Sequence, residues 1–308
     1  MQGFESHIAG NKTKTVLIML GFFAGVVALG YFAGFLVEPM IADIILVGAV
    51  FLAIFSTGMS YWYADSVITK MVDARPANPN VYIEKYYIDT VEGLVLAAGL
   101  PAIPKAYVIE SDALNAFATG RDPEHSLIGV TTGLLNTLDR QELEGVIAHE
   151  MSHIYNRDTL LMMVAAILVG GIALFSHSIM RILFYGGGSG GRRSRDNDSG
   201  GGAGAILIVV ALVFMILAPI FANMLNLFLS RKREFLADAT AVSLARNPDG
   251  LISALKKISA NHQPMPFVEK ELSALFIDNP LHAAHGETSS VFSTHPPMSA
   301  RIRALESM

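Results

Sequence analysis

The residues most able to do chemistry form one H-E-x-x-H pattern, His149-Glu150-Met151-Ser152-His153. Positions i and i+4 of a helix lie on one face, so two imidazoles at this spacing can bind one divalent metal. The intervening Glu150 is then placed beside the open coordination position of that metal. The pattern therefore predicts a zinc hydrolase site, with His149 and His153 as metal ligands and Glu150 as the carboxylate that activates water.

A helix must present these side chains, and the preceding sequence predicts one. Asp139 is followed three residues later by Glu142, which is the pattern of a capping box at a helix start. Leu143, Val146 and Ile147 then recur at helical spacing. We therefore expect the motif to lie on a helix. The alternative is a surface helix whose two histidines and glutamate are merely solvated.

The third metal ligand is expected to be a carboxylate. Catalytic zinc takes three protein ligands and one open position, and the chain has no cysteine. The candidate is Glu234, which lies four residues before Asp238 on what reads as another helix, so both carboxylates face one way. Alone, such an acidic pair is usually a surface feature. Here one of the two is expected to bind the metal, with Glu234 as the candidate, and the other to accept the ring N–H of a ligating histidine.

The composition indicates a membrane protein. Of the 308 residues, 52 % are hydrophobic and 16 % are charged, and the mean hydropathy is +0.45. A helix needs about 20 apolar residues to cross the bilayer core. Four stretches meet this requirement: residues 15–37, 40–63, 159–184 and 203–229. The lysines and arginines near their ends favour a cytoplasmic location for both termini and for most of the polar sequence.

These spans also decide whether the predicted ligands can meet. His149 and His153 precede the third span and Glu234 follows the fourth, so two crossings return the chain to the side it left. Since the ligands lie only a few residues outside the spans, we expect the metal close to the cytoplasmic membrane surface. Substrates within its reach would be juxtamembrane segments and unfolded parts of membrane proteins.

The expected organisation is one discontinuous metalloprotease domain, helical with a small β-sheet, on four membrane helices. Residues 1–63 form a transmembrane hairpin, and residues 64–158 form the first part of the metalloprotease domain. Residues 159–229 form a second transmembrane pair with a Gly/Arg-rich outer loop at 185–204, and residues 230–308 complete the domain.

A sheet edge is the expected place for the substrate. Asn115, Ala116 and Phe117 lie between residues 105–110 and 126–130, which both read as strands. An edge strand can bind an extended peptide through main-chain hydrogen bonds, which are largely blind to sequence. These three residues are therefore the predicted substrate-binding residues, although Phe117 is better suited to a core position. Broad specificity follows from this mode of binding.

A set of motifs gives the chain a family resemblance. In chain order they are Asn115-Ala116-Phe117-Ala118-Thr119-Gly120, the H-E-x-x-H pattern, Asn156-Arg157-Asp158, Glu234-Phe235-x-x-Asp238 and Ser293-Thr294-His295-Pro296-Pro297. Together they resemble the HtpX-type membrane zinc endopeptidases of bacteria, which are relatives of the CAAX prenyl proteases. The resemblance covers nearly the whole chain, from the first span to Leu305.

The resemblance implies an α-helical protein of the bacterial inner membrane with a gluzincin-like, mainly α (α+β) metalloprotease domain. It implies one Zn²⁺ per chain, polypeptide substrates, and a part in stress response and membrane protein quality control. It implies His149, His153 and Glu234 as the metal ligands and Asp238 as the orienting carboxylate. Glu150 would serve as general base and then as proton donor.

For two residues near the C-terminus the interpretation stays open. The resemblance implies that His295 hydrogen-bonds the developing oxyanion. From the residues alone, the His-Pro-Pro sequence is a helix start, where a histidine often only packs. Arg301 either braces the same region or is a surface charge.

Other classes of protein explain less of the sequence. A metal transporter would place its ligands within the spans, whereas the best cluster here lies outside them. A non-catalytic zinc-containing membrane scaffold or holdase would close its metal with four protein ligands and leave Glu150 without a task; it remains the alternative. A net charge of −5 and the lack of a basic, aromatic-interleaved patch argue against nucleic acid as a partner.

Overall fold

The computed structural model describes residues 2–35, 39–168, 170, 231–261, 263–268, 270–281 and 296–308. The chain divides into two compact units. Unit 1 comprises Met1–Thr15, Tyr61–Ala166 and Asn226–Met308, and unit 2 comprises Val16–Ser60 and Ile167–Leu225. Unit 1 thus takes in the start of the chain, which the sequence had assigned to the transmembrane hairpin.

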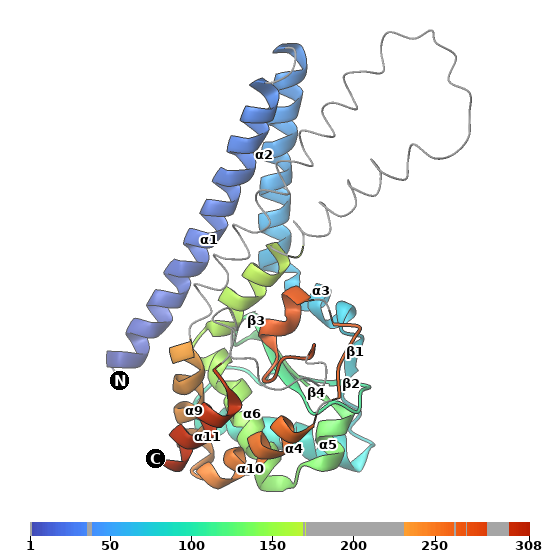
Figure 1. Ribbon diagram of the computed structural model, residues 1–308, viewed down its shortest axis with the longest axis vertical. Coiled ribbons are helices and arrows are strands. Elements are labelled where there is room, and N and C mark those ends of the chain that lie inside the picture. Colours follow the sequence, from blue (N-terminus) through green and yellow to red (C-terminus); the bar gives the residue numbers. More distant parts are fainter. Residues whose placement is uncertain are drawn as a thin grey trace, which may run out of the picture. The chain divides into compact units, whose positions relative to one another are not determined.

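Two long helices begin the chain, α1 (Gln2–Phe35) and α2 (Pro39–Trp62) (Figure 1). Within α1, Ala9–Ala28 is the one clear candidate for a membrane span among the described residues. Leu46–Trp62 of α2 passes the same test only together with α3 (Ala64–Met71), from which it is bent by 75°.

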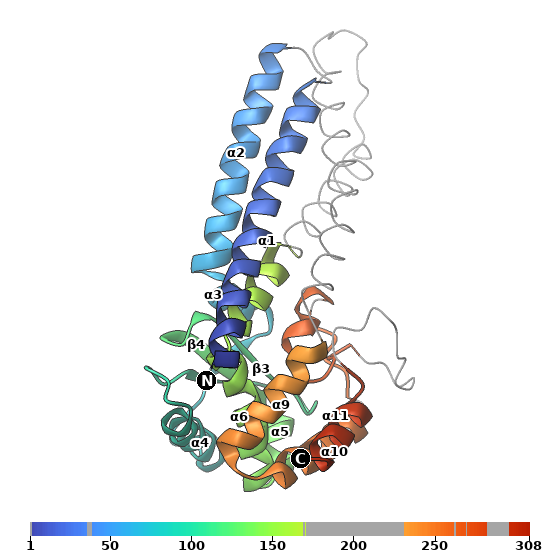
Figure 2. The same ribbon diagram turned by 90° about the vertical axis from the view of Figure 1, so that its left-hand side faces the viewer.

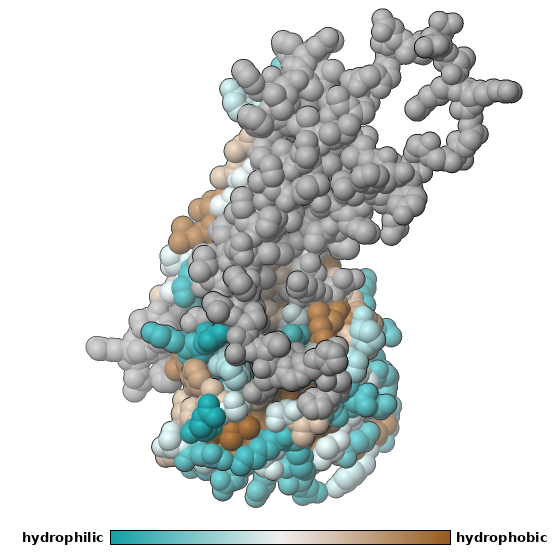
Figure 3. Space-filling view, viewed as in Figure 1, coloured by the Kyte–Doolittle hydropathy of each residue, from teal (hydrophilic) through white to brown (hydrophobic). Residues whose placement is uncertain are grey.

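Several large apolar side chains of α1 and α2 are exposed: Val16, Leu17, Leu20, Ile44, Val47, Phe51, Ile54 and Phe55. Such a concentration of exposed apolar surface is typical of a face that contacts a membrane or another protein. By contrast, the described part of unit 1 that faces the viewer in Figure 3 is mostly hydrophilic.

Of the four expected spans, one is clearly found and the second is found only as part of a bent pair. The third and fourth spans and the outer loop fall almost entirely outside the described residues. Asp158–Leu168, at the start of the third, is a short apolar helix.

Unit 1 contains a four-stranded mixed sheet with the order β1-β2-β4-β3. The strands are β1 (Ala74–Pro76), β2 (Lys105–Ile109), β3 (Ala116–Asp122) and β4 (His125–Thr131). β2 and β4 are parallel, and the outer pairs are antiparallel. The two strands expected from the sequence are confirmed as β2 and β4, and β3 forms one edge of the sheet.

The remaining helices of unit 1 pack around the sheet and around one another (Figures 1 and 2). They are α4 (Tyr82–Ala98), α5 (Thr132–Thr137), α6 (Arg140–Tyr155), α9 (Arg231–Ala245), α10 (Pro248–Ala260), the short 3₁₀ helix η1 (Lys270–Leu275) and α11 (Met298–Glu306). α6 is the central element, because α4, α9, α10 and β3 all pack against it. A mainly helical protein with a small sheet was expected, and this is confirmed.

The start of α6 confirms the predicted capping box. Asp139 Oδ1 accepts hydrogen bonds from the backbone N–H groups of Gln141 and Glu142, at 2.9 and 3.0 Å. Glu142 Oε2 in turn accepts from the backbone N–H of Asp139 at 2.7 Å. These bonds satisfy N–H groups that have no partner within the helix, so α6 starts at a defined residue and its later side chains face a defined direction.

Candidate metal centre

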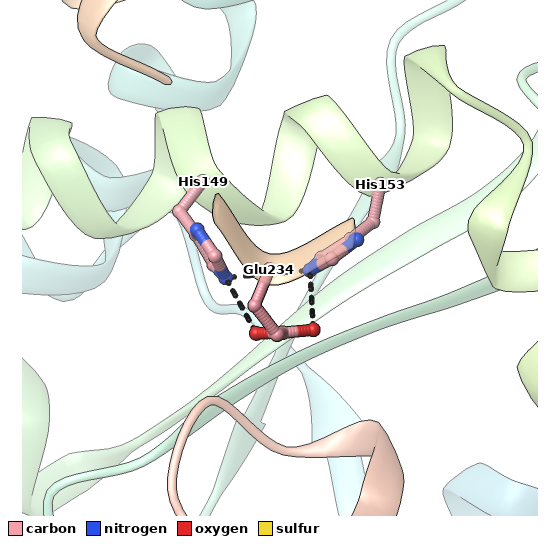
Figure 4. Close-up of side chains that lie close together, drawn as sticks. All are labelled: His149, His153 and Glu234. Atoms are coloured by element: carbon pink, nitrogen blue, oxygen red, sulfur yellow. Dashed lines mark hydrogen bonds and ion pairs between the residues drawn. The ribbon is translucent and has the colours of Figure 1, made fainter. Parts of the chain in front are cut away.

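His149 and His153 of α6 point toward Glu234 of α9 (Figure 4). One ligand atom of each residue lies within 4.8 Å of the other two. The two histidine Nε2 atoms are 3.3 Å apart, and oxygens of Glu234 lie 3.8 Å from the Nε2 of His149 and 3.9 Å from that of His153. Two ligands of a tetrahedral zinc, each about 2.0 Å from the metal, are about 3.3 Å apart. The imidazole pair therefore already has the spacing that zinc requires.

The second ring nitrogen of His149 contacts the carboxylate that the sequence had suggested. Asp238 Oδ1 lies 2.9 Å from His149 Nδ1, and both side chains are 1 % exposed. Arg301 of α11 donates to both oxygens of Asp238, from Nε at 2.9 Å and from Nη2 at 2.6 Å. Burial raises the pKa of Asp238, but the charge of Arg301 and the bond from His149 outweigh it and lower this pKa to about 2. Arg301 is fully buried, so it braces the site and is not a surface charge.

His153 has an orienting carboxylate that sequence reasoning missed. Asp158 Oδ2 lies 3.0 Å from His153 Nδ1. The connection is possible because Arg157, just after the end of α6, adopts a left-handed backbone conformation with φ of 60°. A signal for this pair was present, since a ligating histidine usually donates its second ring N–H to an acceptor, and Asp158 is the first acid after the motif.

Glu150 lies between the two histidines in sequence and is buried, with 1 % of its surface exposed. The backbone N–H of Ala118 in β3 donates a hydrogen bond to its carboxylate. Burial raises the pKa of Glu150 to about 7, against the opposing charge of His153. A carboxylate that exchanges a proton near neutral pH suits a general base.

The surroundings shift the pKa values of the two histidines in opposite directions. Burial lowers the pKa of His149 to about 4, with Arg301 acting in the same direction. Burial also lowers the pKa of His153, but the bond to Asp158 and the charge of Glu234 outweigh it and raise this pKa to about 9. The carboxylates therefore hold a proton on His153, and a metal ion binds an imidazole by taking the place of such a proton. Two imidazoles and a carboxylate form a donor set that zinc accepts, so the residues present fit zinc.

Among the described residues, a second group could also approach a metal. Asp122, Glu124 and His125 lie at the turn between β3 and β4, where the last two are exposed. Asp122 Oδ1 accepts hydrogen bonds from the backbone N–H of His125 and contacts its Nδ1, both at 2.8 Å. This arrangement is that of a turn closed by its own side chains, so the buried group is the candidate metal centre.

The residues expected to bind substrate contact another part of the chain. Asn115 Nδ2 donates to the backbone oxygen of Asp278 at 2.9 Å. The backbone N–H of Ile277 donates to the backbone oxygen of Ala116, also at 2.9 Å. The ring of Phe117 is fully buried and lies 5.2 Å from that of Phe276. Residues 276–278 therefore cover the sheet edge at these three residues. His295 lies outside the described residues.

Comparison with known proteins agrees with this geometry. Residues 84–308 match the model of peptidase family M48. The chain is 46 % identical to a protease HtpX homolog of Listeria innocua, over 98 % of this chain and 99 % of that protein. It is 41 % identical to a protease HtpX homolog of Thermoanaerobacter pseudethanolicus, over 97 % of this chain and 96 % of that protein.

Among solved structures, Ste24p of S. mikatae aligns with a TM-score of 0.49 and 18 % identity, over 98 % of this chain and 67 % of that one. The chain belongs to peptidase family M48 and is a metalloprotease of the HtpX type.

Proposed function

We propose that the protein is a zinc-dependent endopeptidase that cleaves membrane or misfolded proteins near the cytoplasmic surface of the bacterial inner membrane. The proposal rests on the buried group of His149, His153 and Glu234 in a chain of family M48. Glu150 lies on α6 between the two histidines. When bound, zinc supplies Lewis acidity, which lowers the pKa of a water molecule and polarises the scissile carbonyl.

The side chains divide the remaining work. Asp238 and Asp158 hold the Nδ1 atoms of His149 and His153, which leaves each Nε2 to face the metal. Glu234 of α9 is the third ligand. Glu150 takes the proton of the attacking water and passes it to the leaving amine, as a general base and then a general acid. His295 is proposed to hydrogen-bond the developing oxyanion, as the resemblance implies.

The substrate is proposed to pair with the edge of the sheet formed by β3. Residues two apart in a strand direct their main-chain groups to the same side. Since the backbone oxygen of Ala116 faces Ile277, away from β4, the main-chain groups of Ala118 and Gly120 face the same outer edge. The Ala118 N–H already reaches Glu150, so a peptide paired here would pass beside the general base. Asn115, Ala116 and Phe117 stay a prediction as direct substrate contacts.

The membrane part of the proposal has separate support. It rests on the exposed apolar side chains of α1 and α2, on the four apolar stretches, and on the distribution of lysine and arginine near their ends. Only a few residues separate the ligands from the third and fourth stretches, which supports a position of the metal close to the membrane surface. A site there would act on juxtamembrane and unfolded segments and would have little preference for sequence.

The decisive variant is Glu150→Gln. We expect it to bind one zinc per chain, as the wild type does, and to lose cleavage of unfolded casein by about 10²-fold or more, because only the proton carrier is removed. Zinc content and casein cleavage are measured on full-length, detergent-purified protein. Glu144→Gln is the matched control, since it makes the same change on the same helix six residues earlier and should leave both values unchanged. Substantial cleavage by Glu150→Gln would exclude Glu150 as the base.

The same experiment tests the alternative of a zinc-containing scaffold or holdase. A scaffold or holdase would contain zinc both as the wild type and as Glu150→Gln, and neither protein would cleave casein. A structural zinc is usually closed by four protein ligands, whereas the group found among the described residues has three. Glu234→Ala would leave two of these three ligands, so this variant should lose the metal. Stoichiometric zinc in that variant would require a different third ligand.

A further inference from the structure

We propose that Asn11 of α1 is a positioning residue of the metal centre, which holds Asp158 and, through it, the imidazole of His153. Asn11 lies 147 residues before Asp158 in the chain. The inference rests on the proposed zinc site, and it assigns to the N-terminal helix a part in building that site.

The contacts form a continuous path. Asn11 Nδ2 donates hydrogen bonds to Asp158 Oδ1 at 2.7 Å and to the backbone oxygen of Asn156 at 3.0 Å. An amide nitrogen has two hydrogens, so both are used in holding the turn after α6. The other oxygen of Asp158 lies 3.0 Å from His153 Nδ1. Asn11 and Asp158 are 8 % and 1 % exposed, so water does not replace these bonds easily.

The turn that Asn11 holds contains a residue in an unfavourable backbone conformation. Arg157 has a left-handed backbone conformation with φ of 60°, which is unfavourable for a residue with a side chain. Asn11 bonds the residue on each side of Arg157, namely the backbone of Asn156 and the side chain of Asp158. It therefore stabilises the one backbone conformation that turns Asp158 back toward His153.

A second group also approaches Asp158. Arg233 Nη1 lies 3.9 Å from Asp158 Oδ1, which is an ion pair at the limit of the usual distance. The amide of Asn11 is closer by more than an ångström and has hydrogen-bond geometry. Arg233 supplies charge to this carboxylate, whereas Asn11 fixes its orientation.

The consequence concerns the first helix. Asn11 lies within Ala9–Ala28, the candidate membrane span of α1, and belongs to unit 1 with the metal centre. The first turns of α1 are therefore a structural component of the metal site and not only an anchor.

The test compares the zinc affinity of Asn11→Ala with that of Thr13→Ala, in the full-length protein. Thr13 is the matched control because it is exposed on the same helix and its hydroxyl donates to the backbone oxygen of Ala9. Changes to residues that hold a metal ligand lower metal affinity by about 10- to 100-fold. We expect the zinc Kd of Asn11→Ala to rise about tenfold, with a changed visible absorption spectrum of the cobalt-substituted protein, and that of Thr13→Ala to stay the same.

Two outcomes of this comparison have distinct meanings. Absence of zinc in the wild type would contradict the proposed function. Tight zinc binding by the wild type, with an equal Kd and cobalt spectrum in Asn11→Ala, would overturn the inference and leave the proposed function intact.

A double-mutant cycle separates positioning from packing. If Asn11 acts through Asp158, then Asn11→Ala should not weaken zinc binding further in an Asp158→Ala background, because the effects of coupled residues are not additive. A packing role alone would raise the Kd by the same factor in both backgrounds, and that result would overturn the inference.

The wild type provides the test if Asn11→Ala does not accumulate as folded protein. Coupling between two sites is reciprocal, so zinc should slow hydrogen exchange and proteolysis of residues 2–15 in the wild type. It should not do so in Asp158→Ala. Equal protection in the two proteins, or none in the wild type, would overturn the inference.

Discussion

At the scale of single residues, the metal centre is ordered in layers. His149 and His153 each have an Nδ1 atom beside a carboxylate, Asp238 and Asp158 respectively. Each carboxylate is held in turn by a side chain from a distant element, Arg301 from α11 for Asp238 and Asn11 from α1 for Asp158. A neutral imidazole that donates from Nδ1 presents an unprotonated Nε2. The orientation of each histidine therefore depends on its carboxylate and on the side chain that holds this carboxylate.

Arg301→Met tests the first of these layers. It leaves the carboxylate of Asp238 buried without its charged partner, which should lower the free energy of unfolding by about 3–5 kcal/mol. Zinc binding should weaken as well, because His149 loses its fixed acceptor. Thermal unfolding and zinc affinity are measured beside Arg303→Met, an exposed arginine of the same helix, as the control. Equal stability of the two variants would show that Arg301 does not brace the site.

At the scale of elements, α6 and α10 position the H-E-x-x-H motif by crossing closely. A Cβ atom on Gly145 of α6 would lie 2.6 Å from the backbone nitrogen of Leu251 in α10, and one on Gly250 would meet the backbone of Gln141. Each helix therefore has a glycine at the point of closest approach. His149 follows Gly145 by one helical turn, so the crossing and the metal site are coupled.

Gly145→Ala should consequently destabilise the protein by about 1–3 kcal/mol, since the added methyl group forces the two backbones apart. The control is Gly93→Ala in α4, where nothing lies within 4 Å of an added Cβ. Alanine is the better helix former by about 1 kcal/mol, so this variant should unfold at the same or a higher temperature. A Gly145→Ala protein as stable as Gly93→Ala would contradict the close crossing.

The contact between the start of α6 and α10 should make stability depend on pH. Burial raises the pKa of Glu142, but hydrogen bonds from Lys257, Ser253 and the backbone of Asp139 outweigh it, and the pKa is lowered from 4.5. A carboxyl whose pKa is lowered by folding stabilises the protein above its unfolded pKa, and this stabilisation is lost as the pH falls through the folded value.

Glu142→Gln is therefore expected to lower the melting temperature at neutral pH and to reduce the further loss on acidification. Melting temperatures are recorded from about pH 7 to pH 3 for the wild type, Glu142→Gln and the control Glu144→Gln. Parallel curves for the wild type and Glu142→Gln would mean that Glu142 is not the titrating group.

At the scale of the whole molecule, unit 1 is assembled from three separate parts of the chain. Glu234 comes from one part, the two histidines from another, and Asn11 from the third. A metal bound by α6 and α9 would therefore act as a link between segments that are 81 residues apart, counted from His153 to Glu234.

Chelation of zinc should accordingly lower the melting temperature of the wild type. A ligand that binds only the folded state, present at about 1,000 times its Kd, stabilises that state by about 4 kcal/mol. The measurement compares unfolding of the wild type with and without a chelator, and Glu234→Ala should show no response. An unchanged melting temperature in a wild type that had contained stoichiometric zinc would contradict the proposed link.

The amino-acid sequence alone determined the features that depend on neighbours along the chain. Helical spacing was enough to place the two histidines on one face, to pair Glu234 with Asp238 and to predict the capping box of α6, because these relations span only three or four residues. The set of motifs along the chain carried the resemblance to the metalloprotease family. The pattern of helices and strands predicted a mainly helical protein with a small sheet.

Only the tertiary structure decided which distant groups meet. Asn11 reaches Asp158 across 147 residues and Arg301 reaches His149 across 152, and no local pattern encodes either contact. The turn at Arg157 and the cover of residues 276–278 over β3 depend likewise on packing between elements. Contacts of this kind follow from how buried faces fit together in three dimensions, which the spacing of residues in one segment does not specify.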